Sequence, residues 1–370
     1  MKRFVLLSLV LACGVSLSAQ GGVQLTPLGT WVGKVQEYAN PFDANLDRNV
    51  TAAEARITVA PGWTEDPSYR LSYIVNRRDG VSVSVGGGRI SGVAGQTGWV
   101  TFQAMENDAS KMFHVGTIIT YQRNNNSTTM PWTLKLGTGG STANWASSPV
   151  VQSGGGAQAA SFQIVEVGKI AGIGEIKKYD SFRLDITAVS NGTADFNEVL
   201  LLPDRLERIP VFKATNRVTP TSSATATDLL NSNGNQAWRV VDSPTGDTIT
   251  FEFSGMKQVD AIVFWGNNDI TLGAEFTLRY VDSTTGGLVD VASINMKPES
   301  NSGVTAGMVL PLQLLEPIMT NKIILEFPAG THSLREVMLF TALEKAPIPE
   351  PATMTLLALG GLALLRRRRA

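Results

Sequence analysis

The chain has 370 residues, of which 17% are charged and 43% hydrophobic, with a formal net charge of -1. This balance excludes an intrinsically disordered chain and argues against nucleic acid as a partner. A single cysteine excludes an intrachain disulfide framework, and two histidines leave little material for a zinc site. Low charge together with 36 glycines favours an exported, β-rich protein.

The first 19 residues have the features of a secretory signal peptide. A positive start at Lys2 precedes the apolar run 4–15, and small residues end it around Ser18. The run is shorter than the ~20 residues that a membrane-spanning helix needs. We therefore expect signal peptidase to remove residues 1–19. Lipidation at Cys13 is an alternative, although the residues before Cys13 fit that pattern poorly.

Residues 43–54 match the ligand spacing of an EF-hand calcium loop. Alternating Asp and Asn side chains and a terminal Glu supply the oxygens that Ca²⁺ prefers. Arg48 stands where such loops carry the Gly of a sharp turn, so a polar surface turn is the alternative. The candidate ligands are Asp43, Asn45, Asp47, Asn49 through its carbonyl, Thr51 and Glu54.

Apolar and polar residues alternate with period two through most of the remaining chain. Ile249, Phe251 and Phe253, for example, alternate with Thr and Glu. Short β-branched runs separated by turn residues predict an all-β protein with two tandem β-sandwich or jelly-roll domains, at 20–206 and 207–343. Other predicted strands include Trp31–Tyr38, Leu71–Val75, Gly80–Val85, Trp99–Phe102, Thr117–Tyr121, Trp132–Leu136 and Val259–Trp265.

A weak internal repeat supports this division. Phe182–Ile186 is followed after a loop by Asn197–Leu202, and Lys322–Phe327 is followed by Arg335–Phe340. In both copies a polar residue, Glu and Val open the second apolar strand. The repeat predicts two related domains in tandem, and the alternative is coincidence between generic strand sequences.

Residues 211–342 resemble the galactose-binding-like jelly roll of the discoidin or coagulation-factor type C family. The order of three pieces carries the resemblance: Asp228–Trp238, the apolar strand Val259–Trp265, and Arg335–Val337 near the end. The two leucines after Asp228 depart from the family's usual Asp-Gly. The first domain resembles the family only near its end.

The resemblance implies two kinds of site in this domain. A structural Ca²⁺ would be held by Asp228 and Glu336, with Glu198 playing the same part in the first domain. For each Glu the alternative is a hydrogen bond to buried loop backbone. A sugar would meet aromatic faces and polar donors on loops at one end of the sandwich, although most sandwich Trp residues are core. The candidate sugar contacts are Trp238, Arg239, Trp265, Asn267 and Asn268.

Catalysis finds little support in the sequence. It contains no GxSxG, no HExxH and no P-loop lysine motif. The glycine-rich stretches 137–140 and 154–156 lack the strand-to-helix context of a phosphate-binding loop. We therefore expect a protein that is not an enzyme.

The C-terminus, residues 347–370, has three parts. Pro349, Glu350 and Pro351 precede the uncharged run 352–365, and a cluster of arginines follows, Arg366, Arg367, Arg368 and Arg369. As a helix the run spans ~21 Å, so it crosses a ~30 Å hydrocarbon core only if the arginines snorkel. By the positive-inside rule the arginines stay in the cytoplasm and the passenger lies outside.

This order resembles the PEP-CTERM sorting signal. The resemblance implies a bacterial surface or matrix protein, processed near the Pro-Glu-Pro motif by an exosortase-type transpeptidase after an inner-membrane intermediate in a Gram-negative-type cell. We predict a non-catalytic role in adhesion or binding of extracellular polysaccharide. The alternatives are a structural matrix protein without a specific ligand and a divergent secreted hydrolase.

Overall fold

The structure is a computed structural model. It describes residues 29–31, 34–43, 49–68, 70–79, 88–122, 131–154, 161–166, 176–188, 192–217, 224–230, 238–266, 274–296 and 307–346. The predicted signal peptide, the strand predicted at Gly80–Val85 and the sorting segment from residue 347 lie outside these ranges. Within them, no helix combines the length and hydropathy that a membrane span requires.

The N-terminal half is built on a six-stranded antiparallel sheet in the order β12-β11-β15-β7-β3, with β8 paired to β7. Along β15, Phe182, Leu184 and Ile186 are buried while Arg183 and Asp185 are half-exposed. This alternation is typical of a sheet with one face in the core. The strands are β3 (Ala55–Val59), β7 (Thr97–Glu106), β8 (Ala109–Ser110), β11 (Trp132–Gly137), β12 (Val150–Gly154) and β15 (Ser181–Thr187).

Three smaller sheets complete this half. The first has the order β13-β10-β17, from β13 (Ser161–Glu166), β10 (Thr117–Gln122) and β17 (Glu198–Leu202). The second has the order β16-β6-β4, from β16 (Thr193–Phe196), β6 (Gly88–Ser91) and β4 (Thr64–Glu65). The third pairs β14 (Lys177–Tyr179) with β9 (Phe113–Val115). Short 3-10 helices lie at η1 (Leu71–Ile74) and η2 (Gly140–Thr142).

The C-terminal half forms an 11-stranded sheet whose main path is β1-β23-β22-β24-β21-β25-β18. Its own strands are β18 (Arg205–Arg208), β19 (Lys213–Asn216), β20 (Trp238–Ser243), β21 (Asp247–Gly266), β22 (Glu275–Val281), β23 (Leu288–Asn295), β24 (Gly307–Phe327) and β25 (Gly330–Glu344). The 3-10 helix η4 (Ala226–Leu230) packs beside β25. Near its start β21 alternates buried Ile249, Phe251 and Phe253 with half-buried neighbours, as the sequence predicts.

Three strands from the N-terminal half belong to this second sheet. β1 (Gly29–Trp31) pairs with β23, β2 (Val35–Glu37) pairs with β24, and β5 (Arg78–Asp79) also pairs with β24. The division at 206/207 stays a prediction. Strands from before residue 206 and strands from after residue 207 are nevertheless joined by main-chain hydrogen bonds in one sheet.

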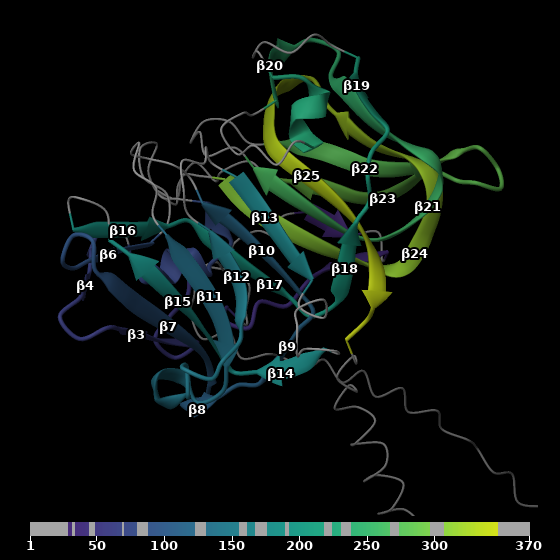
Figure 1. Ribbon diagram of the computed structural model, residues 1–370. Helices are drawn as coiled ribbons and strands as arrows, with labels where there is room; N and C mark the ends of the chain where they lie inside the picture. Colours follow the sequence, from purple (N-terminus) through teal and green to yellow (C-terminus); the bar gives the residue numbers. More distant parts are fainter. Residues whose placement is uncertain are drawn as a thin grey trace, which may run out of the picture.

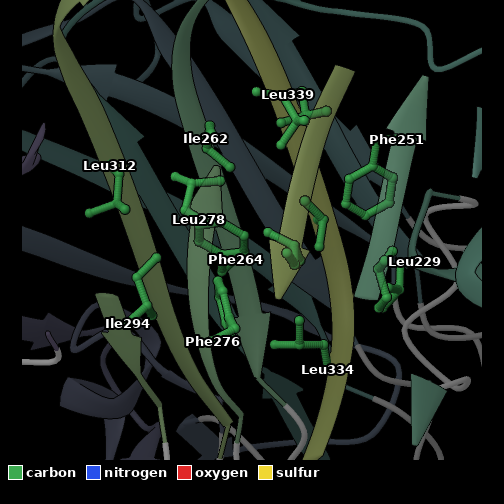
Figure 2. Packing of buried hydrophobic residues seen from close by; sticks show 14 of the residues in the cluster. Leu229, Phe251, Ile262, Phe264, Phe276, Leu278, Ile294, Leu312, Leu334 and Leu339 are labelled. Carbon is green, nitrogen blue, oxygen red and sulfur yellow. The ribbon is translucent and has the colours of Figure 1, made fainter. Parts of the chain in front are cut away.

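Figure 1 shows the N-terminal half in blue and teal beside the C-terminal half in green and yellow. Three clusters of buried hydrophobic residues lie between and within these halves. One cluster lies between the six-stranded sheet and the sheet that contains β10 and β17. A second lies between that sheet and β21, β24 and β25. The third fills the C-terminal sandwich, where Phe264 and Phe276 lie 5.0 Å apart between ring centroids (Figure 2).

The two copies of the predicted repeat occupy corresponding places in these layers. In β17, Leu200 and Leu202 contact the middle cluster, whereas Val199 and Leu201 face the N-terminal core. In β25, Met338 and Phe340 contact the same middle cluster, whereas Val337 and Leu339 face the C-terminal core. Both segments are therefore buried on both faces, which explains why Val199–Leu202 and Val337–Phe340 are apolar without interruption.

Two strand predictions are wrong. The single strand predicted at Trp31–Tyr38 is two strands, since β1 ends at Trp31 and pairs with β23, whereas β2 begins at Val35 and pairs with β24.

The strand predicted at Leu71–Val75 is the second error. Residues 71–74 form the 3-10 helix η1 instead of part of a strand over Leu71–Val75. Leu71 and Ile74 are buried while the two residues between them are half-exposed, which is a period of three, not two. The Glu65 carboxylate accepts the Leu71 N–H at 2.6 Å and helps to hold the turn at the start of this helix.

Candidate functional site

The structure describes the two ends of the predicted calcium loop, at Asp43 and at residues 49–54. Asp43 is fully buried, and Glu54 accepts hydrogen bonds from the backbone N–H of Thr51 at 3.1 Å and from its hydroxyl at 2.8 Å. Asn49 is exposed, whereas Asn45 and Asp47 lie outside the described residues. No group of three or more His, Cys, Asp or Glu placed to hold a metal occurs in the part of the chain that the structure describes. A Ca²⁺ site in this loop stays a prediction.

The carboxylate of Glu336 faces a guanidinium. Arg208 donates from Nη2 to Glu336 Oε1 at 2.6 Å and from the same nitrogen to the carbonyl of Leu230 at 3.0 Å. Glu336 is fully buried, and the Arg208 side chain is 26% exposed. Arg208 thus joins helix η4 to the buried Glu, which is the bridging task that the family resemblance gives to Ca²⁺.

Asp228 makes local contacts at the start of η4. It accepts hydrogen bonds from the backbone N–H of Thr225 at 2.6 Å and from its hydroxyl at 3.0 Å. These bonds satisfy donors that a helix start leaves without a partner. Asp228 therefore shapes the turn into η4.

Glu198 is held in a comparable way in the other half. Its Oε1 accepts the backbone N–H of Arg77 at 3.1 Å, which is the bond to loop backbone that the sequence left as the alternative. The Arg77 guanidinium reaches Glu37 at 3.0 Å and the carbonyl of Ala39 at 3.0 Å. Arg77 has φ 59, in the left-handed region that non-glycine residues rarely adopt. In both copies of the predicted repeat the buried Glu accepts a hydrogen bond from an Arg residue, from the guanidinium of Arg208 and from the main-chain N–H of Arg77.

Two predicted sugar contacts lie in the core. Trp238 and Trp265 are both 0% exposed, and Trp238 packs against Phe327 with ring centroids 4.9 Å apart. Neither indole offers a face to solvent, so neither is placed to stack on a sugar. Arg239 is half-exposed, and residues 267–268, the predicted contacts Asn267 and Asn268, lie outside the described residues.

A partly open cavity of about 430 Å³ lies elsewhere on the C-terminal sheet, and we call it the Tyr280 groove. Its volume is within the range of small-molecule sites. One wall comes from β22, another from the middle of β24, and the third from the residue just before β2. The lining residues are Lys34, Tyr280, Leu315, Glu316, Pro317 and Ile318.

The backbone explains why the groove forms there. Pairing between β21 and β24 shifts register between Val259 and Ala261, opposite β24 residues 313–318. Pro317 lies in this stretch and has no N–H to donate to a neighbouring strand. Leu315–Pro317 are exposed as a result, and the Leu315 N–H bonds to the carbonyl of Lys34 at 2.9 Å.

The groove combines apolar and charged groups. Ile318 is buried against the C-terminal core and Tyr280 packs partly against it, whereas Leu315 is 51% exposed. Lys34 and Glu316 are both exposed, and the Lys34 ammonium makes one long hydrogen bond, 3.3 Å to the carbonyl of Asp290. This site was not predicted from the sequence, because Lys34 and Tyr280 are brought together only by the pairing of β2 with β24.

Comparison with known sequences identifies the C-terminus. Residues 347–369 match the PEP-CTERM protein-sorting motif. This confirms the predicted sorting signal, and it marks the chain as an exported protein of the cell surface or extracellular space. No curated protein matches the chain.

Similar solved structures include a fucolectin from striped bass serum (Morone saxatilis), 13% identical over 84% of this chain and 100% of that one, with a TM-score of 0.31. Another is the CBM32 of AlyQ in complex with 4,5-unsaturated mannuronic acid, 18% identical over 37% and 99%, at 0.29. A third is the family 32 carbohydrate-binding module of Clostridium perfringens NanJ in complex with galactose, 16% identical over 37% and 99%, at 0.30. These are galactose-binding-like jelly-roll domains.

Proposed function

We propose that this protein is an exported surface or matrix protein that binds a carbohydrate without catalysis, and that the Tyr280 groove is the binding site. The observation that carries the binding role is that a half-buried aromatic ring, an exposed Lys and an exposed Glu line the same groove. A sugar ring has an apolar C–H face and polar hydroxyl edges. Tyr280 and Leu315 suit the first, and Lys34 and Glu316 supply a donor and an acceptor for the second.

The composition of the groove favours binding over hydrolysis. Glycoside hydrolases use two carboxyl groups on opposite sides of the scissile bond. Among the groove residues in the described part of the chain, Glu316 alone is acidic. A divergent hydrolase is therefore the weaker alternative, and a structural matrix protein without a ligand is the stronger one.

The sorting motif supports the export route in this proposal. Signal peptidase removes residues 1–19, the C-terminal run holds the passenger at the inner membrane of a Gram-negative-type cell, and an exosortase-type transpeptidase processes the chain near Pro349–Pro351. The mature protein then meets polysaccharide at the cell surface or in the matrix.

Replacing Tyr280 with alanine is expected to weaken glycan binding about tenfold, since losing one aromatic contact costs roughly 1–1.5 kcal/mol. A glycan-array screen of residues 20–346, with Ca²⁺ and with chelator, identifies the ligand class. Calorimetric titration of the best glycan then compares the two proteins.

Tyr73 offers the matched control, because it is also half-buried but lies in η1, away from the groove. Tyr73→Ala should bind like the wild type. Equal binding by wild type and Tyr280→Ala would move the site elsewhere. A folded protein that binds no glycan in either condition would favour the structural role.

A further inference from the structure

The last described residues are held to the body by three successive polar contacts. Arg205 donates to Glu344 at 3.1 Å, the Lys345 ammonium lies 3.1 Å from an oxygen of Asp260, and the Ala346 N–H donates to Asp204 Oδ1 at 2.8 Å. We call Asp204, Asp260 and residues 344–346 the Asp204 clamp. The contacts come from the turn after β17, from β18 and from β21.

Asp204 is fixed from several sides. It is 2% exposed, and its second oxygen accepts the Tyr38 hydroxyl at 2.8 Å and the Gln313 amide at 3.4 Å. Burial, and then the charge of Asp204, raises the pKa of Tyr38, so its hydroxyl stays protonated and donates. Asp260 is 1% exposed and accepts the Ala342 N–H at 2.9 Å. The clamp is therefore built on buried carboxylates.

The clamp ends where the sorting motif begins. Ala346 is the last clamped residue, and the match to the motif starts at residue 347. Three steps along the chain separate Ala346 from Pro349, which is roughly 10 Å when fully extended. Only this short piece of chain therefore separates the clamped Ala346 from the Pro-Glu-Pro motif.

We propose that the Asp204 clamp restricts access to the sorting motif and that it must open before the chain is processed. This inference rests on the proposed sorting function. Processing breaks one peptide bond near Pro349–Pro351. The carbonyl carbon of that bond forms a new bond to water or to an acceptor amine, and the released amine takes up a proton. An enzyme that needs an extended substrate acts on the opened state, so its rate follows the population of that state.

The test uses Ala346→Pro, which removes the clamping N–H and leaves the buried carboxylates in place. Pulse–chase labelling of the full chain in its own cells measures the processing rate. Because a hydrogen bond to a charged group is lost, we expect processing about tenfold faster than in wild type. Ala346→Gly keeps the N–H and is the matched control, with a rate within about twofold of wild type.

A second variant separates clamping from an effect of proline on the enzyme. Six Gly/Ser residues inserted after Ala346 give the motif free chain, so processing should be fast with either Ala or Pro at position 346. Hydrogen exchange of the full chain in detergent reports the clamp directly, since residues 341–346 should exchange about tenfold faster in Ala346→Pro.

The outcomes separate the two proposals. Faster processing of Ala346→Pro, with a difference from wild type that the insertion abolishes, supports the clamp. Equal rates in all variants, despite faster exchange, overturn it and leave the sorting function standing. A wild-type chain that is never processed overturns the sorting function and, with it, the clamp.

Discussion

Arg208→Ala should destabilise the protein by about 3 kcal/mol, because the fully buried Glu336 would lose the guanidinium that faces it at 2.6 Å. The value is at the low end for buried pairs, since the Arg208 side chain is 26% exposed and water enters once it is removed. The Leu230 carbonyl at the end of η4 would also lose its donor. Thermal unfolding followed by circular dichroism should show a melting temperature lower by roughly 5–10 °C.

Arg205→Ala is the matched control. Arg205 lies on the same strand and pairs with Glu344 at 3.1 Å, but the Glu344 side chain is 41% exposed. A pair whose carboxylate is exposed to water contributes about 0–1 kcal/mol, so this variant should lose much less stability than Arg208→Ala. If both variants lose the same stability, the charge of Glu336 is balanced by another group.

The Arg208–Glu336 pair also predicts how the protein responds to removal of calcium. With a guanidinium already at Glu336, we expect a chelator to leave the melting temperature of the wild type unchanged. A clear fall on chelation would instead support the sequence-based prediction of Ca²⁺ at Asp43–Glu54 or at Asp228 and Glu336. The melting temperature of Arg208→Ala with added Ca²⁺ distinguishes these two sites. The substitution removes the guanidinium at Glu336, so it leaves room for Ca²⁺ there and does not change the site at Asp43–Glu54.

Trp265→Ala should cost about 3–5 kcal/mol, the usual range for removing a large aromatic side chain from a core. Trp265 is 0% exposed and lies in the middle cluster, with its ring centroid 5.6 Å from that of Tyr121 on β10. The cavity would open between strands of the N-terminal and C-terminal halves. Denaturant unfolding should therefore show a lower midpoint by probes in both halves.

Trp99→Ala provides the comparison for this variant. Trp99 is half-exposed on β7, where the Arg183 guanidinium lies 4.8 Å from the ring centroid. A contact of this kind at a partly exposed site contributes roughly 1 kcal/mol. Similar losses for the two Trp variants would contradict the assignment of Trp265 to a core between the halves.

The spacing of apolar residues along the chain was enough to predict several strands. The alternation around Ile249–Phe253 and the mostly apolar run Val259–Trp265 both predicted strands, and both lie in β21. The pattern failed at Leu71–Val75, where apolar residues three apart lie in a 3-10 helix and the Leu71 N–H bonds to the Glu65 carboxylate. A window of five residues is too short to distinguish these two periods reliably.

The candidate site could not be predicted in the same way. Trp238 and Trp265 have the residue type of a sugar contact, but whether an indole is exposed depends on what packs against it. The Tyr280 groove needs Lys34 from the start of the chain beside residues of β22 and β24. No spacing in the sequence encodes a contact between segments so far apart.

The sequence by itself determined the sorting motif and the all-β class, because these depend on composition and on short-range order along the chain. Only the tertiary structure decided that Arg208 faces Glu336, that β17 and β25 are buried on both faces, and that Ala346 is bonded to Asp204. The physical reason is that burial and charge pairing arise between strands distant in sequence, and many pairings of strands share one period-two pattern.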